Sequence, residues 1–188
     1  MRIISGLFKG KKLLEPKDIK TRPLKDLTKE SIFNIILHSN KFNLEFSNAS
    51  ILDMFAGVGS FGIECLSRGA KYVVFAENYD GVLPILKKNL KNLNSIQNFK
   101  ILEKNIYDEN FFSDLNKQYD LIFLDPPYKD KNISKILLNI KNSKILNKKG
   151  IIITHRHKNE TDMFPSNIRI IEEKKYGISK ISFFSILN

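Results

Sequence analysis

Apolar and polar positions alternate along most of the chain in blocks that indicate strands and helices in turn. Short apolar runs are typical of strands buried on both faces, and apolar positions three or four residues apart are typical of helices. The runs predict strands at 51–55, 71–77, 99–104, 119–125 and 151–155. The spaced patterns predict helices at 60–68, 81–93, 108–117 and 133–146. Two further runs, 168–174 and 180–186, indicate an antiparallel pair that turns at Tyr176-Gly177.

This alternation predicts an α/β fold, namely a doubly wound, mostly parallel sheet with right-handed crossovers and an antiparallel closing strand. The residues before it differ in character. Residues 1–24 are basic and broken by Gly and Pro, with short strand-like stretches near 2–5 and 12–14. A helix is predicted at 26–38, followed by a polar, Asn-rich linker at 39–50. We therefore expect a small basic extension, residues 1–46, and a sheet-bearing domain, residues 47–188.

The composition of the chain narrows its class. A length of 188 residues with 42% hydrophobic content suffices for one well-buried domain and a short appendage. No apolar run approaches the ~18 residues of a membrane span, and no secretory leader is present, so we expect a cytoplasmic protein. The single Cys65 lies in an apolar helical pattern, which is typical of a core residue in a reducing compartment.

Positive charge is concentrated near the amino terminus. The net charge of +11 favours a polyanionic partner, with nucleic acid ahead of a membrane surface. Seven basic side chains in residues 1–22 stand against Glu15 and Asp18. We expect this segment to contact nucleic-acid phosphates through Arg2, Lys9, Lys11, Lys12, Lys20 and Arg22. A solvated lysine-rich surface is the alternative, since lysine is abundant throughout the chain.

A glycine-rich turn follows the first predicted strand. Residues 57–62 read Gly-Val-Gly-Ser-Phe-Gly, which is the G-x-G-x-x-G pattern of nucleoside cofactor sites. Glu77 follows 20 residues after Gly57, at the end of the second strand, where a carboxylate can accept both ribose hydroxyls. This spacing suits NAD and S-adenosylmethionine alike. Asp53 favours the second, because a carboxylate beside the glycines attracts a cofactor ammonium and repels a pyrophosphate.

The fourth strand ends on Asp125-Pro126-Pro127-Tyr128. Two prolines remove two backbone donors, so the loop presents a carboxylate, carbonyl acceptors and an aromatic face at the carboxyl end of a strand. Ligands of open α/β sheets bind at that edge. Such a loop suits a planar base with an exocyclic amine, whose hydrogens the acceptors would take while Tyr128 stacks on the ring. A plain Pro-Pro strand stop is the alternative.

Two histidines, His155 and His157, stand at the end of the fifth strand. A metal site needs further Cys, Asp or Glu ligands at suitable spacing, and the sequence offers none. We therefore expect no metal here and give both side chains a surface or RNA-facing role.

Several of these motifs together resemble the RsmD-type methyltransferases of bacteria. They are residues 53–59, 67–70 and 123–128, together with an amino-terminal block from Arg2-Ile3-Ile4 through Thr21-Arg22-Pro23 that continues into residues 29–34. The resemblance covers nearly the whole chain. Members of that family methylate the N2 amine of one guanine in the 16S ribosomal RNA of the small subunit.

The resemblance implies a Rossmann-like class I methyltransferase fold with S-adenosyl-L-methionine along the carboxyl edge of the sheet. It implies that Asp53, Gly57 and Gly59 hold the methionine moiety, that Glu77 holds the ribose, and that Asn105 and Ile106 lie near the adenine. It further implies that Asp125, Pro126 and Tyr128 act on the guanine. The implied partner is 16S rRNA within the small subunit, and no oligomeric partner is implied, so we expect a monomer.

The sequence departs from the family pattern at two positions. Asn105 stands where an acid is more usual, and Lys29 stands where arginine is usual in what would be a phosphate contact.

Three other functions fit parts of the pattern. An adenine-N6 methyltransferase acting on DNA or RNA shares the Asp-Pro-Pro-Tyr loop, but needs a target-recognition domain for which this chain is short. A Rossmann NAD-dependent oxidoreductase shares the glycine turn. A noncatalytic RNA-binding module would share the fold without needing Asp53, Glu77 and Asp125.

Overall fold

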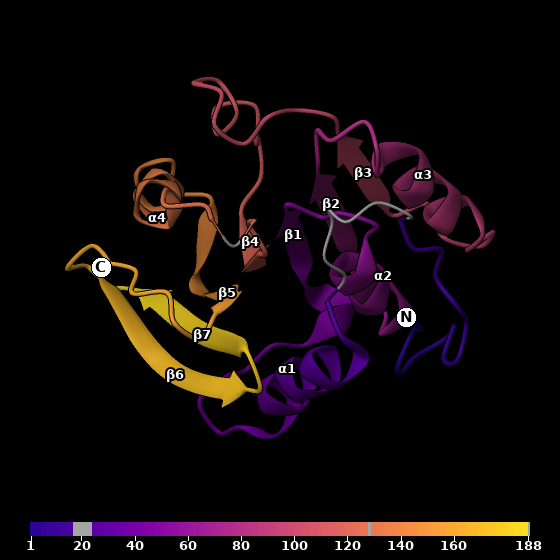
Figure 1. Cartoon of the computed structure of the whole chain (residues 1–188), viewed down its shortest axis with the longest axis horizontal. Helices are drawn as coiled ribbons and strands as arrows, with labels where there is room; N and C mark the ends of the chain where they lie inside the picture. Colours follow the sequence, from indigo (N-terminus) through magenta and orange to yellow (C-terminus); the bar gives the residue numbers. More distant parts are fainter. Residues whose placement is uncertain (17–23, 128, 188) are drawn as a thin grey trace.

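A seven-stranded sheet forms the centre of the molecule (Figure 1). The structure is a computed structural model that describes residues 1–16, 24–127 and 129–187. The strand order is β3-β2-β1-β4-β5-β7-β6. Strands β1 to β5 run parallel, and β7 is antiparallel to both of its neighbours. The bounds are Ser50–Met54 (β1), Tyr72–Ala76 (β2), Phe99–Leu102 (β3), Tyr119–Leu124 (β4), Leu146–His157 (β5), Ile168–Tyr176 (β6) and Ser179–Ile186 (β7).

Helices cover both faces of the sheet because the parallel strands are apolar on both sides. Helices α1 (Asp26–His38), α2 (Ser60–Ser67) and α3 (Leu83–Lys91) share one hydrophobic core with one face. Helix α4 (Ile133–Asn142) and residues 106–115 share a second core with the other face. The predicted α/β fold with its antiparallel closing strand is therefore confirmed. A short 3₁₀ helix, η1 (Phe46–Asn48), lies within the predicted linker.

One predicted helix is wrong. Residues 108–117 form turns, although Phe111, Phe112 and Leu115 are buried against the sheet as the apolar pattern required. The segment is rich in Asn, Asp and Ser, whose side chains compete for backbone groups and favour turns. The predicted helix at 133–146 also ends early, since Leu146 already belongs to β5.

The amino-terminal segment packs onto the sheet-bearing domain. Arg2 and Lys12 form an isolated antiparallel bridge, and Ile3 and Leu13 are buried in the same core as α1. Lys29 stands where the family usually has arginine in what would be a phosphate contact. Its side chain is fully buried here, so it does not face solvent as a phosphate contact would. Its ammonium donates to the carbonyl of Arg2 at 2.7 Å. Among the described residues, no helix is long and apolar enough to cross a membrane.

Candidate active site

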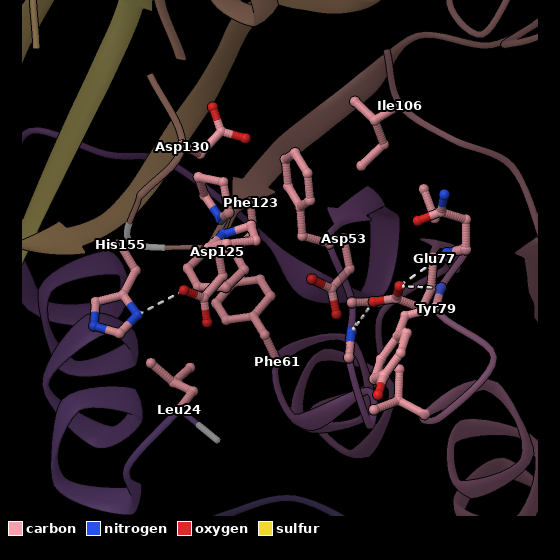
Figure 2. A pocket seen from close by; sticks show the side chains of 18 of the residues that line it. Leu24, Asp53, Phe61, Glu77, Tyr79, Ile106, Phe123, Asp125, Asp130 and His155 are labelled. Carbon is pink, nitrogen blue, oxygen red and sulfur yellow. Dashed lines mark hydrogen bonds and ion pairs between the residues drawn. The ribbon is translucent and has the colours of Figure 1, made fainter. Parts of the chain in front are cut away.

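A cavity of about 640 Å³ lies over the carboxyl ends of β1, β2 and β4. Asp53 comes from β1, Glu77 follows β2 and Asp125 follows β4, so three neighbouring strands each contribute one carboxylate. Figure 2 shows Asp125 and His155 at one end of the cavity, Glu77 at the other, and Asp53 between them. Phe61 and Phe123 also line the cavity, stacked with ring centroids 3.9 Å apart.

Backbone amides hold the Glu77 carboxylate in place. Its Oε2 accepts a hydrogen bond from the Gly57 N–H at 2.7 Å. Its Oε1 accepts bonds from the N–H groups of Asn78 and Tyr79, each at 2.8 Å. Donors from two segments therefore fix the carboxylate at the edge of the cavity, in the position expected for binding a ribose.

The two predicted cofactor-binding glycines differ in what they do. Gly57 lines the cavity with φ +54°, in the left-handed region that suits glycine. Gly59 precedes α2 with φ +85°, and a Cβ there would lie 2.6 Å from Leu86 Cδ1. Gly59 is not among the described lining residues; it allows the close packing of α2 against α3 that positions the turn.

Asp53 is 1% exposed and accepts a hydrogen bond from the Gly62 N–H at 2.9 Å. Burial, together with the neighbouring charges of Asp125 and Glu77, raises the pKa of Asp53 to about 8. Such a carboxyl is costly to ionise without a nearby cation. The site therefore favours a positively charged group next to Asp53.

The far wall of the cavity comes from the segment after β3. Asn105 and Ile106 both line it, as the resemblance implied for the adenine. The Asn105 Oδ1 accepts a hydrogen bond from the Tyr107 N–H at 3.0 Å, so this carbonyl already has a backbone partner. The hydroxyl of Tyr107 donates to Asp130, which joins this wall to the loop that follows β4.

The Asp125 loop is held from strand β5. Asp125 Oδ1 lies 2.8 Å from His155 Nδ1. The Pro127 carbonyl accepts from the Asp130 N–H at 2.8 Å and from Arg156 Nη1 at 3.2 Å. Since Pro127 O is engaged by the protein, Pro126 O is the loop carbonyl that best suits a ligand. Asp125 and Pro126 line the cavity, whereas Tyr128 lies outside the described residues.

The surface position predicted for His155 is wrong, while its RNA-facing role stays a prediction. The residue is 6% exposed and lines the cavity beside Asp125. The register explains why: β4 and β5 pair Leu124 with Thr154, which places the next residues of the two strands side by side. Sequence reasoning also missed Arg156, whose side chain is 1% exposed and ion-paired with Asp162 at 3.2 Å.

Acidic residues outnumber basic ones around the cavity. Among the described lining residues, the acids are Asp53, Glu77, Asp125 and Asp130, and the only lysine or arginine is Lys129. A pyrophosphate would meet repulsion from this wall, whereas a ligand with ammonium and sulfonium groups would be attracted.

The predicted RNA-binding arm is exposed where it is described. Arg2, Lys9, Lys11 and Lys12 are all exposed. Arg2 lies 3.9 Å from the Asp26 carboxylate, and the Lys11 ammonium donates to the Asn92 carbonyl. Lys20 and Arg22 lie outside the described residues. The arm reaches the site through Asn89, whose amide donates to the carbonyls of Leu14 and Val58 at 3.1 and 3.0 Å.

A sheet in the order 3-2-1-4-5-7-6 with β7 antiparallel, and a cavity over the ends of its first strands, defines a class I methyltransferase fold. The comparison with solved structures agrees: "Putative methyltransferase yhhF" of Escherichia coli matches with a TM-score of 0.80 and 26% identity, covering 100% of this chain and 98% of that one. The chain belongs to the family described as Conserved hypothetical protein 95, whose model matches residues 1–185.

Two curated relatives are named "Ribosomal RNA small subunit methyltransferase D". The protein of Buchnera aphidicola is 33% identical over 172 residues, covering 92% of this chain and 86% of its own length. That of Haemophilus influenzae is 32% identical over 181 residues, covering 95% and 90%. The expected membership of the RsmD-type family is thereby confirmed.

Proposed function

We propose that this protein is an S-adenosylmethionine-dependent methyltransferase that modifies the N2 amine of a guanine in 16S rRNA. The observation that carries this proposal is that Asp53, Glu77 and Asp125 line one cavity, at the ends of adjacent strands. The names of the relatives support ribosomal RNA as the substrate class.

The chemistry of the cavity fits the cofactor. S-adenosylmethionine supplies an electrophilic methyl group on a sulfonium when it is bound. Asp53 would attract its ammonium, Glu77 would accept the ribose hydroxyls, and Ile106 would offer an apolar surface to the adenine. The excess of carboxylates around the cavity supports a cationic cofactor over NAD.

The loop after β4 would activate the substrate amine. An exocyclic guanine amine is a poor nucleophile because its lone pair is delocalised into the ring. Acceptance of its hydrogens by the Asp125 carboxylate and the Pro126 carbonyl favours a pyramidal nitrogen with a localised lone pair. The ionised carboxylate also stabilises positive charge that develops on the nitrogen, in a site that is already organised before reaction. Tyr128 is our candidate for stacking on the base.

The exposed arm would guide the RNA. Lys9, Lys11, Lys12 and Arg2 lie on the segment whose end Asn89 ties to the glycine turn. Contacts between these side chains and RNA phosphates would bring a flipped-out base to the cavity. We propose the small ribosomal subunit, rather than free RNA, as the substrate particle.

Labelled S-adenosylmethionine, small ribosomal subunits that lack the modification, and mass spectrometry test the proposal. We expect label on one guanine N2 with the wild-type protein and none with Asp125→Ala, whose cofactor affinity should stay within a few-fold. Asp114→Ala, on an exposed acid paired with Lys104, is the matched control and should keep full activity.

Other outcomes select the competing functions. Label on adenine N6 would replace the guanine assignment. A rise in melting temperature with NAD but not with S-adenosylmethionine would indicate an oxidoreductase. Near-normal methylation by Asp125→Ala would remove that residue from the chemistry.

A further inference from the structure

His155 bridges two side chains that come from different parts of the chain. Its Nδ1 lies 2.8 Å from Asp125 Oδ1, and its Nε2 lies 2.9 Å from Ser179 Oγ. Asp125 follows β4, His155 lies on β5 and Ser179 begins β7. His155 and Ser179 are each 6% exposed, so the contact between them is buried, whereas Asp125 is partly open to the cavity. Figure 2 shows the imidazole beside Asp125, on the side away from Asp53 and Glu77.

Hydrogen-bonding capacity fixes how these contacts run. An ionised carboxylate can only accept, so His155 Nδ1 must carry the proton that it donates to Asp125. In the neutral imidazole the other nitrogen is then an acceptor, and it takes its hydrogen bond from the Ser179 hydroxyl. The acceptor-only Asp125 carboxylate thereby selects the form with a proton on Nδ1, and Ser179 holds the opposite side of the ring in place.

The same contact sets the direction of the Asp125 carboxylate. A donor on Oδ1 leaves Oδ2 for the cavity, where the substrate amine would lie. It also stabilises the negative charge of Asp125 in a cavity that already holds the acids Asp53 and Glu77.

We infer that His155, held in place by Ser179, is a positioning residue that fixes Asp125 Oδ1 and presents Oδ2 to the substrate amine. This inference rests on the proposed methyl transfer and adds a residue to that site. In this proposal His155 acts through Asp125 and not directly on the reacting atoms. Its substitution should therefore lower kcat and leave the affinity for S-adenosylmethionine unchanged.

A graded set of variants separates positioning from mere packing. His155→Asn keeps an N–H near the place of Nδ1, whereas His155→Leu fills the space without any donor. We expect kcat to fall on the order of 10²-fold in His155→Leu, as for misplaced catalytic groups. His155→Asn should recover most of this loss, and Ser179→Ala should fall between the wild type and His155→Leu.

Two controls distinguish a loss of positioning from a loss of folding. Cofactor affinity by calorimetry should stay within about twofold in all variants, which also shows that they fold. Lys149→Gln is the control on the same strand, because its exposed side chain lies at the opposite end of β5 from the site. Its kcat at saturating RNA should equal that of the wild type.

A spectroscopic measurement is independent of turnover. Imidazole ¹⁵N chemical shifts of the wild-type protein should show a protonated His155 Nδ1, and Asp125→Ala should lose this preference for Nδ1. The opposite tautomer in the wild type, or equal kcat in His155→Leu and wild type, would overturn the inference. Absence of methylation by the wild type would instead overturn the proposed function, and the ¹⁵N result would still stand.

Discussion

Lys29 and Glu64 are both fully buried, and the Lys29 ammonium lies 3.8 Å from the Glu64 carboxylate. Glu64 also accepts the backbone N–H groups of Ile4 and Ser5 at 2.7 and 2.9 Å. The pair thus joins α1 and α2 to the start of the amino-terminal arm. Burial lowers the pKa of Lys29, although the nearby Glu64 and Asp26 carboxylates oppose that shift.

Removing one charge of this pair should destabilise the fold. Glu64→Gln leaves the Lys29 ammonium buried without its main counter-charge, which costs about 3–5 kcal/mol for such pairs. Urea unfolding followed by circular dichroism measures the loss. The double variant Lys29→Met/Glu64→Gln should be more stable than Glu64→Gln alone, because the fully buried ammonium is then removed, while Arg68 loses its Glu64 partner in both variants. Strictly additive losses would show that the two side chains are not coupled.

Asp53 makes the stability of the protein depend on pH. Its pKa rises from 3.8 to about 8 on folding, so the native state retains a proton that the unfolded chain has lost. Its contribution to the free energy of unfolding is therefore fully present below about pH 4 and is lost as the pH rises through about 8. Asp53→Asn removes this titration while keeping an acceptor for the Gly62 N–H.

We expect the melting temperature of Asp53→Asn, relative to the wild type, to increase between pH 5.5 and pH 9 by roughly 10 °C, because about 1.4 kcal/mol is lost for each pH unit up to the pKa and each kcal/mol corresponds to ~2–4 °C in a chain of this size. The same variant should bind S-adenosylmethionine at least tenfold more weakly. Asp114→Asn, an exposed acid, is the control and should show no pH-dependent difference. A constant difference across this pH range would argue against the raised pKa.

Arg156 should affect turnover although it is not one of the proposed acceptors, because it supports the loop that carries them. It donates to the carbonyls of Pro127 and Asp130 at 3.2 and 2.5 Å, and so holds the loop that carries the proposed acceptors. Arg156→Lys keeps the charge but loses the planar fork that reaches both carbonyls. We expect a fall in kcat of roughly 10–100-fold, as for residues that support a catalytic group.

The cofactor affinity of Arg156→Lys, measured by calorimetry, should remain close to that of the wild type, since Arg156 contacts the substrate side of the cavity. Arg169→Lys on the exposed strand β6 is the control. Equal losses of kcat and cofactor affinity would indicate general unfolding and not a displaced loop.

Charge removal on the arm should weaken RNA binding in a salt-dependent way. The double variant Lys9→Gln/Lys12→Gln should reduce the slope of log affinity against log salt by about 0.7–0.9 for each phosphate that the arm no longer neutralises. Lys148→Gln/Lys149→Gln removes the same charge near the start of β5, at the opposite end of that strand from the site. Equal slopes for both double variants would assign the effect to net charge and not to the arm.

The sequence predicted the strands and the carboxylates at their ends because both are local patterns. Apolar runs mark buried strands; Asp53 lies near the end of such a run, and Glu77 and Asp125 each follow one. The partnership of Asp125 with His155 was not predictable in the same way, because it depends on the register between β4 and β5 and on the docking of β7. The burial of Lys29 was not predictable for a related reason. It depends on how α1 packs against α2, and the residues next to Lys29 in the sequence do not show this packing.

Ser179 lies on β7, which follows every other part of the site along the chain. A nascent chain leaves the ribosome amino terminus first, so Asp125 emerges before the strand whose docking completes its support. β6 and β7 form a hairpin, and its β7 strand pairs with β5. A chain that ends before Ser179 would hold the three carboxylates of the cavity but lack the partner of His155 Nε2.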